Sequence, residues 1–589
     1  MSKRNDKGAN IMKFFLHQTH HTIADFDAIF ETICELVKNK EPGVHIFPEL
    51  FLCGYPLQDL VLQKPFIEKY QQLLQRIQEL NGSSEQIFLF GGLQYDLAAH
   101  GIVKKIENVV FQWSPGSSLQ SIYTKKLLPN YDIFDEKKYF TPGEQTTVIE
   151  LGELKAGILI CEDMWHSNLH PIDPTEQLFA KSKELGGVDI VINLSASPYQ
   201  IKKHKNRIAR ASEISSEFEC PFLYVNRVGA EDEILFDGQS FIQSGSETLL
   251  QLKRFNKDSV SWEYQGFSQD NKTNKSDVIT LTWEQLFQAE LTDSNPPIIP
   301  EWDDDTCLEV IQSLIFGMQE YARKNGFKKF LVALSGGIDS GLVLALAQLG
   351  LQTDQELEAV YMPGQYSRSI SFDLSLQMCN NIGIKLKSLP IKFLHANCRN
   401  QFIQQLSSPL EGLADENIQS RLRGALIYAR SNQTGAMVIN TSNKSELAVG
   451  YSTQYGDSVG ALSLLGDLFK SQVFQLSRFI NKKWDGLIPD EMITRAPSAE
   501  LREDQVDEES LPPYQRLDAI LECLLSYRYS SQEIIDMGFK KQEVEKVLHL
   551  YKNSEYKRFQ FAPIIKIRAK SFGFGYRIPL SKNSNYLFE

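Results

Sequence analysis

The stretch "KKFLVALSGGIDSGLVLALAQLG", residues 328–350, decides the fold of the second half of the chain. An apolar run is followed by the small-residue segment "SGGIDS", 335–340, and then by a second apolar run. This order predicts a buried strand, a tight turn and a helix. Small residues let backbone N–H groups approach an oxyanion, and a helix N-terminus adds a favourable dipole. We therefore expect a phosphate-binding loop that opens an α/β domain.

The complete S-G-G-x-D-S string is more specific than a glycine pair in a turn. It is not a Walker A loop, because no G-K-[ST] follows. It resembles the pyrophosphate loop of ATP pyrophosphatases, enzymes that adenylylate a substrate and release pyrophosphate. The resemblance implies a Rossmann-like doubly wound parallel sheet, with Asp339 near metal-bound phosphates. It also implies ATP contacts for Ser335, Gly336, Gly337, Asp339 and Ser340.

Further strings narrow the class. Four segments resemble NAD synthetases in the same order, at 414–457, 464–473, 496–514 and 571–581; the first includes "NKSELAVGYSTQYGD". Taken singly, Arg421 and Arg423 could equally form a solvated helix face, and Glu446 could be a helix cap. The resemblance implies the following roles: Mg²⁺ and phosphate binding by Asp339 and Glu446, ATP contacts by Thr441 and Lys470, and deamido-NAD contacts by Arg421, Lys444 and Asp457.

The reaction implied by this resemblance has two steps. The nicotinate carboxylate of deamido-NAD attacks the α-phosphorus of ATP, and Mg²⁺ offsets charge on the phosphates. Ammonia then attacks the adenylate, which gives NAD, AMP and pyrophosphate. Ammonia is mostly protonated at neutral pH, so a dedicated source of ammonia would help this reaction.

The first half contains a candidate for that source. In "GILICEDMW", 157–165, an apolar run ends at Cys161, and Glu162 and Asp163 follow. Neighbouring carboxylates raise the pKa of a thiol, whereas a nucleophilic cysteine needs a base or a cation. Cys161 is therefore either an inert core residue or a nucleophile served by distant residues.

Two other segments supply suitable residues. Glu49 lies in "IFPELFLCGYPLQDL", 46–60, and Lys125 lies in "YTKKLLPNYDIFDEKKYF", 123–140. Together with Cys161 they resemble the Glu–Lys–Cys triad of the nitrilase (carbon–nitrogen hydrolase) superfamily, whose fold is an α-β-β-α sandwich. The resemblance makes Glu49 the general base, Lys125 the stabiliser of the thiolate and oxyanion, and Cys161 the nucleophile that forms a thioester. The backbone N–H of Glu162 would be a second oxyanion donor.

The alignment with this superfamily leaves some choices. Lys126 is the alternative to Lys125 as the lysine of the triad. We prefer Lys125, because the family pattern K-x-H-L-P-N-Y aligns here as K-K-L-L-P-N-Y. Leu127 and Asp132 depart from the common histidine and glycine of the pattern. Glu136 resembles a second, supporting glutamate, although it could be a plain surface acid.

Glutamine-dependent NAD synthetases carry a nitrilase-like domain ahead of the synthetase, and the resemblance covers residues 11–589. It implies a glutamine pocket made by Tyr131, Glu162, Ser197 and Lys203, where Lys203 replaces an arginine known in some members. In "EDEILFDGQSF", 231–241, Gln239 replaces a family glycine. Cys53 matches no family motif of this kind, and we expect it to lie in the core.

Length and composition fit two or more domains. The chain has 589 residues and 42% hydrophobic content, and its formal net charge of −13 argues against non-specific nucleic-acid binding. Its eight cysteines include no C-x-x-C pair, which suits a reducing cytoplasm. The N-terminus lacks the apolar run of a secretory signal, and no run of about 18 uncharged apolar residues predicts a membrane span.

The order of elements predicts the domain limits. Short β-rich runs alternate with helical patterns in the first half, the segment 251–277 is polar and irregular, and 291–305 is Pro-rich and acidic. We therefore predict a nitrilase-like domain over 11–275, a linker over 276–305 and a synthetase domain over 306–589.

The leading hypothesis is an amidotransferase that makes NAD from deamido-NAD, ATP and glutamine, with Mg²⁺, as a homo-oligomer expected from the family. The alternatives are another pyrophosphate-loop amidotransferase and a degenerate scaffold.

Overall fold

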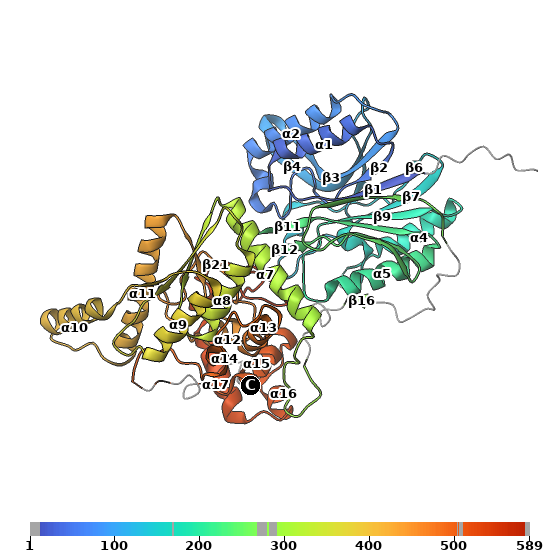
Figure 1. The fold of residues 1–589 in the computed structure, drawn as a ribbon. Helices are drawn as coiled ribbons and strands as arrows, with labels where there is room; N and C mark the ends of the chain where they lie inside the picture. The colour runs from blue at the N-terminus through green and yellow to red at the C-terminus, as the bar shows by residue number, and fades with distance from the viewer. Residues whose placement is uncertain are drawn as a thin grey trace, which may run out of the picture. The chain divides into compact units, whose positions relative to one another are not determined.

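The computed structural model describes residues 12–167, 170–267, 280–281, 291–503, 505 and 511–583. The chain forms two compact units (Figure 1). The first unit comprises Met1–Glu231 and Leu235–Leu286, and the second comprises Asp232–Ile234 and Phe287–Glu589. The predicted boundary between 275 and 276 lies outside the described residues, so the predicted domain limits stay predictions. Within the described ranges, no helix is long and apolar enough to span a membrane.

The first unit contains two six-stranded sheets. One sheet has the order β15(Asp258–Glu263)-β1(Lys13–Gln18)-β2(Gly43–Ile46)-β3(Gln86–Leu97)-β4(Val103–Trp113)-β5(Gln120–Thr124). The other has the order β14(Glu247–Gln251)-β13(Phe241–Ser244)-β10(Phe222–Asn226)-β9(Ile190–Ser195)-β7(Leu154–Ile160)-β6(Val148–Leu151). Two short pairs join β11(Val228–Glu231) to β12(Ile234–Asp237) and β8(His166–Ser167) to β16(Thr280–Leu281).

These two sheets face each other across one apolar core. Leu16 and Ile46 from the first sheet pack in the same cluster as Ile158 and Ile192 from the second. Helices α1(Phe26–Asn39) and α2(Lys64–Gln78) flank the first sheet, and α4(Pro174–Glu184) and α5(Lys203–Phe218) flank the second (Figure 1). The predicted α-β-β-α sandwich is therefore confirmed.

Helix α1 illustrates how the sequence specifies these layers. Its buried residues Ile29, Ile33 and Val37 recur every four positions and so share one face. The Asp25 side chain caps the first turn by accepting a hydrogen bond from Ala28 N at 3.3 Å.

One prediction about this unit is wrong. The segment 251–277 was expected to be irregular, but Asp258–Glu263 forms the edge strand β15, antiparallel to β1. Its side chains alternate between half-buried and exposed, and Val260 and Trp262 pack against the core between the sheets. Only one face of this edge strand is covered, so its sequence is largely polar.

The second unit is built around a five-stranded parallel sheet. Its order is β19(Leu386–Ser388)-β18(Glu356–Tyr361)-β17(Lys329–Ala333)-β20(Met437–Asn440)-β21(Leu462–Ser463). The chain moves outward from β17 through α8(Ile338–Gly350) and α9(Ser369–Ile382), and then returns through α11(Gly412–Thr434) to the other side of β17. Right-handed crossovers in opposite directions place helices on both faces of the sheet. This is the predicted doubly wound Rossmann-like fold.

Further helices complete this unit. They are α7(Asp304–Lys324), α10(Lys392–Leu406), α12(Lys444–Val449), α13(Lys470–Lys483), α14(Asp490–Thr494), α15(Tyr514–Glu522), α16(Ser531–Asp536), α17(Lys541–Asn553) and α18(Glu555–Arg558). The strand order reverses between β17 and β20. Ligands in open α/β sheets bind at the carboxyl ends of the strands beside such a reversal.

Candidate active sites

The first candidate site lies where β7 ends. Cys161 follows that strand directly and begins a tight turn, Cys161–Met164, with a left-handed backbone (φ +45°). This conformation costs a non-glycine residue about 1–2 kcal/mol and is found mainly where the surroundings impose it. The side chain of Asn193 accepts from Cys161 N at 2.8 Å, which helps to hold the turn. The thiol is therefore on a constrained turn, as a nucleophile requires.

Glu49 and Lys125 meet at this site. Lys125 Nζ lies 2.7 Å from Glu49 Oε1, and both side chains are 1% exposed. Asn108 also donates to Glu49 Oε1 at 2.7 Å, and Ala196 N donates to Glu49 Oε2 at 2.9 Å. These contacts fix the carboxylate while Oε2 retains capacity for another proton or hydrogen bond.

Glu136 is part of the same cluster and is not a surface acid. Its Oε2 lies 2.8 Å from Lys125 Nζ, and Tyr55 donates to its Oε1 at 3.0 Å. Burial raises the pKa of Glu136, against the lowering effect of Lys125. Although burial alone lowers the pKa of Lys125, Glu136 and Glu49 raise it well above its usual value. Lys125 is therefore a permanent cation between two carboxyl groups.

The same surroundings keep Cys161 protonated at rest. Burial and the Glu49 carboxylate raise the pKa of the Cys161 thiol, and Lys125 only partly offsets this. A preformed thiolate is therefore disfavoured, and the proton must leave as the sulfur attacks. That requirement fits a general base beside the thiol.

The two competing residues lie elsewhere. Lys126 Nζ donates to Thr146 and Gln177 at 2.6 and 2.7 Å, so its ammonium does not join the Glu49 cluster. Cys53 is fully buried, and its thiol donates to Leu50 O at 3.6 Å. Burial raises the pKa of Cys53, which agrees with its predicted place in the core.

Of the four residues predicted for the glutamine pocket, Glu162 follows Cys161 directly, and Tyr131 and Lys203 interact electrostatically with Cys161. Tyr131 donates to both carboxylate oxygens of Glu162, at 2.9 and 3.1 Å. Lys203 begins α5 and interacts electrostatically with Cys161 and Glu162. Burial and the neighbouring Arg207 lower the pKa of Lys203 to about 8.

Ser197 is held by residues that the sequence did not single out. Arg207 is fully buried and donates to Ser197 O, Ser197 Oγ and Pro198 O at 3.0–3.1 Å. Its other nitrogen pairs with both oxygens of Asp237, at 2.8 and 2.9 Å. An arginine in a helical pattern gives no sequence signal for such a buried role.

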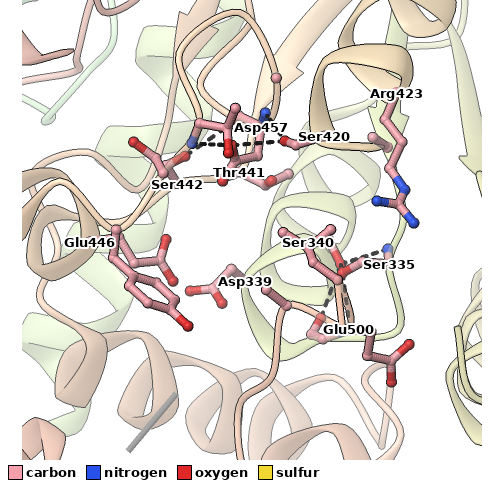
Figure 2. Close-up of a pocket in the computed structure, with 18 of the residues that line it drawn as sticks. Ser335, Asp339, Ser340, Ser420, Arg423, Thr441, Ser442, Glu446, Asp457 and Glu500 are labelled. Carbon is pink, nitrogen blue, oxygen red and sulfur yellow. Dashed lines mark hydrogen bonds between the residues drawn. The ribbon is translucent and has the colours of Figure 1, made fainter. Parts of the chain in front are cut away.

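The second candidate site is a cavity of about 480 Å³ in the second unit, at the carboxyl ends of β17 and β20 (Figure 2). The loop 335–340 forms one wall. Ser340 Oγ accepts from Ser335 N at 3.2 Å and donates to Gly337 O at 3.0 Å, so the loop is closed on itself. Gly336 has φ +84°, and a Cβ there would lie 2.4 Å from Ser371 O. This position requires glycine.

Asp339 and Glu446 point into the cavity from α8 and α12 (Figure 2). Lys470 Nζ bridges them, 2.5 Å from Asp339 Oδ2 and 3.3 Å from Glu446 Oε1. Asn443 donates to Asp339 Oδ1 at 2.8 Å. Two carboxylates of this kind suit Mg²⁺, which is usually held by one or two carboxylates together with substrate phosphates. No group of three potential metal-ligating side chains occurs among the residues that the structure describes.

Three more predicted residues line this cavity: Thr441, Arg421 and Asp457. Asp457 Oδ1 accepts from Thr453 N at 2.6 Å and from Ser420 Oγ at 3.1 Å, which ties the 453–457 loop to α11. Burial raises the pKa of Asp457.

Lys444 is not brought to the cavity. Its side chain is 1% exposed, and its Nζ lies 2.9 Å from Asp467 Oδ1 and also donates to Lys570 O. This lysine is committed to a buried ion pair, so the structure gives it no contact with a dinucleotide in the cavity.

The cavity is also lined by charged residues to which the sequence analysis assigned no role in the site: Arg423, Arg495 and Glu500. Arg495 donates to Ser371 Oγ at 2.9 Å and to Glu500 Oε1 at 2.8 Å. Arg423 donates to Met362 O at 2.9 Å, and burial lowers its pKa. The S-R-x-R string at 420–423 on α11 is visible in the sequence, but its two arginines could not be ranked without the cavity.

The two units match two family models. Residues 16–248 match the carbon–nitrogen hydrolase family, and residues 310–561 match the NAD synthase family. These matches define the class as a nitrilase-type hydrolase followed by an ATP-dependent NAD synthase.

Relatives match over nearly the whole chain. A glutamine-dependent NAD(+) synthetase from Synechocystis is 36% identical, over 91% of this chain and 92% of its own length. The glutamine-dependent NAD(+) synthetase of Acinetobacter baylyi is 35% identical, over 92% of this chain and 93% of its own length. The solved structure of the glutamine-dependent NAD+ synthetase of Acinetobacter baumannii, in complex with ADP, matches this chain with a TM-score of 0.69 and 32% sequence identity. The match covers 97% of this chain and 98% of the Acinetobacter baumannii chain. The chain therefore belongs to the glutamine-dependent NAD(+) synthetases. It is an ATP-dependent ligase that takes nitrogen from glutamine.

Proposed function

We propose that Glu49, Lys125 and Cys161 hydrolyse glutamine and that the cavity of the second unit amidates deamido-NAD. The cluster that carries this proposal is the buried Lys125 between Glu49 and Glu136, with Cys161 on its strained turn beside it.

In the first reaction, Cys161 Sγ attacks the glutamine side-chain carbonyl while its proton passes to Glu49. Lys125 and the N–H of Glu162 stabilise the oxyanion, and losing one such donor typically costs about 10²–10³-fold in rate. The proton on Glu49 then goes to the leaving ammonia, which produces a thioester. Water, deprotonated by Glu49, hydrolyses the thioester, releases glutamate and restores the thiol.

Glutamine recognition is assigned to Tyr131, Glu162, Ser197 and Lys203. Glu162 suits the substrate ammonium, and Lys203 suits the α-carboxylate. Arg207 supports this pocket indirectly, because it holds Ser197 and is itself paired with Asp237.

In the second reaction, the loop of Ser335, Gly336, Gly337, Asp339 and Ser340 holds the ATP phosphates, with Thr441 and Lys470 beside it. Arg421 and Asp457 contact deamido-NAD, whose carboxylate attacks the α-phosphorus and expels pyrophosphate. Ammonia displaces AMP from the adenylate. Asp339 and Glu446 are the residues that would hold Mg²⁺, and a bound Mg²⁺ would neutralise phosphate charge.

Two variants test this division. Cys161→Ala should abolish glutamine-driven NAD synthesis and leave ammonia-driven synthesis intact. Asp339→Ala should stop synthesis from both nitrogen sources, because its role is in adenylylation. Equal loss of both activities in Cys161→Ala, with the fold intact by circular dichroism, would refute the two-site assignment.

We also infer a homo-oligomer in which a second copy covers α10. On this helix Phe393, Ile403 and Leu406 are 77%, 54% and 64% exposed, and only His395 is buried. Sedimentation should give an assembly that Phe393→Glu with Ile403→Glu dissociates. A monomeric wild-type protein would contradict this inference.

We place the enzyme in the cytoplasm, supported by its eight free cysteines.

A further inference from the structure

Asp163, two residues after Cys161, is a fully buried carboxylate that the mechanism above does not use. Its Oδ2 accepts from Ile160 N at 3.2 Å and from Tyr123 OH at 2.8 Å. Its Oδ1 accepts from Leu127 N at 2.8 Å and from Lys126 N at 3.2 Å. One side chain therefore binds two segments that are more than thirty residues apart in the sequence.

These two segments are the ones that carry the nucleophile and the cation. Ile160 N precedes Cys161, and the N–H groups of Lys126 and Leu127 follow Lys125. The backbone of Lys125 has two further hydrogen bonds: Lys125 N donates to Asn108 O at 2.9 Å, and Lys125 O accepts from Gly143 N at 2.8 Å. We propose that Asp163 is a positioning residue that sets the distance between the Cys161 turn and the Lys125 ammonium. The proposal rests on the proposed glutaminase function.

The bonding pattern explains why a carboxylate is needed. Both oxygens face donors, and three of those donors are backbone N–H groups that cannot act as acceptors. An asparagine at 163 could satisfy Lys126 and Leu127 with its oxygen and Tyr123 with its amide. Its amide would then face Ile160 N–H, donor against donor. The Cys161 turn, which already has a left-handed backbone, is the part that would shift.

Burial raises the pKa of Asp163 to about 6, although its hydrogen bonds with Leu127, Tyr123 and Ile160 and the charge of Lys125 oppose this. A pKa below 7 favours the charged form at neutral pH, and the charged form accepts from all four donors. This agrees with a positioning role.

The test compares Asp163→Asn with Asp189→Asn in the full-length enzyme. Asp189 also accepts a backbone hydrogen bond, from Lys155 N at 2.7 Å, but at the opposite end of β7 from Cys161. Asp163→Asn should lower kcat for glutamine hydrolysis by about 10–100-fold and change KM for glutamine by less than threefold, since misplacement of reacting groups acts on the chemical step. Asp189→Asn should leave both near wild type. Ammonia-driven NAD synthesis should be unchanged in both variants.

A second readout separates positioning from stability. The rate at which iodoacetamide alkylates Cys161 is measured against pH by mass spectrometry of the Cys161 peptide. We expect this pH profile to shift in Asp163→Asn and not in Asp189→Asn. An unchanged kcat in Asp163→Asn would overturn the proposal. A lower kcat that comes with an unchanged alkylation profile and a lower melting temperature would overturn it as well. If Cys161→Ala keeps glutamine-driven synthesis, the proposed function fails instead, whatever Asp163→Asn shows.

Discussion

The Lys470 ammonium lies 2.5 Å from the Asp339 carboxylate and 3.3 Å from that of Glu446. These carboxylates are the pair assigned to Mg²⁺, so the lysine provides the positive charge between them in the protein without ligands. When ATP binds, its phosphates offer Lys470 another anionic partner.

Lys470 should therefore compete with a divalent cation in the absence of nucleotide. Lys470→Met should strengthen Mn²⁺ binding to the nucleotide-free enzyme by about tenfold, because a cation beside the site is removed. Electron paramagnetic resonance of free Mn²⁺ measures this directly. Lys482→Met is the matched control, since Lys482 lies on the same helix as Lys470, α13, and pairs at the surface with Asp304 of α7. Equal Mn²⁺ affinity in Lys470→Met and wild type would contradict the competition.

Lys203, proposed to bind glutamine, should make the use of glutamine depend on pH. The pKa of Lys203 is lowered to about 8, so the ammonium is present below pH 8 and is lost as the pH rises through that value. KM for glutamine should rise between pH 7 and 9. Lys203→Arg should flatten that rise, because a guanidinium stays charged throughout. The same rise in Lys203→Arg would show that another group, such as the substrate amine, causes it.

Gln239, which replaces a family glycine, has a left-handed backbone (φ +49°). Its side chain accepts from Arg254 Nε at 3.0 Å, and both Gln239→Ala and Gln239→Gly remove that bond. Only glycine also relieves the strain, so Gln239→Gly should be more stable than Gln239→Ala by about 1 kcal/mol. Thermal melting compares the two variants. An alanine variant as stable as the glycine variant would mean that the backbone carries no strain there.

Gly336 should be essential to the phosphate loop. Gly336→Ala would force a Cβ to 2.4 Å from Ser371 O, whereas Gly337→Ala would meet Ser335 Oγ at 3.3 Å. We expect Gly336→Ala to lower ammonia-driven NAD synthesis by at least about 100-fold, as displaced phosphate contacts would, and Gly337→Ala to lower it less. Steady-state AMP release measures both variants. Similar activities for the two would remove the steric argument.

Much of the fold could be predicted from local patterns. The apolar runs before Cys161 and up to Ala333 form the strands β7 and β17, each of which has a neighbouring strand on both sides. Edge strand β15 was missed because alternation over six residues, with one face exposed, is a weak signal in a polar segment.

The sites could be predicted only in part, because motif residues are visible and their partners are not. The structure brings Glu49, Lys125 and Cys161 together, but Lys444 is in a buried ion pair away from the cavity. Arg207 and Asp163 were not predicted as site residues, because their contacts span distant segments and follow from tertiary packing. Asp132 and Gln239, which the resemblance sets against family glycines, both have left-handed backbones.

The most direct test of the two-site account follows NAD and AMP in the purified enzyme with deamido-NAD, ATP and Mg²⁺. Three reactions receive glutamine, ammonium or neither. The account predicts NAD from both nitrogen sources, none without a source, and glutamate only in the glutamine reaction. NAD from ammonium alone would contradict the assigned glutaminase, and glutamate without NAD in either reaction would contradict deamido-NAD as the substrate of the second unit.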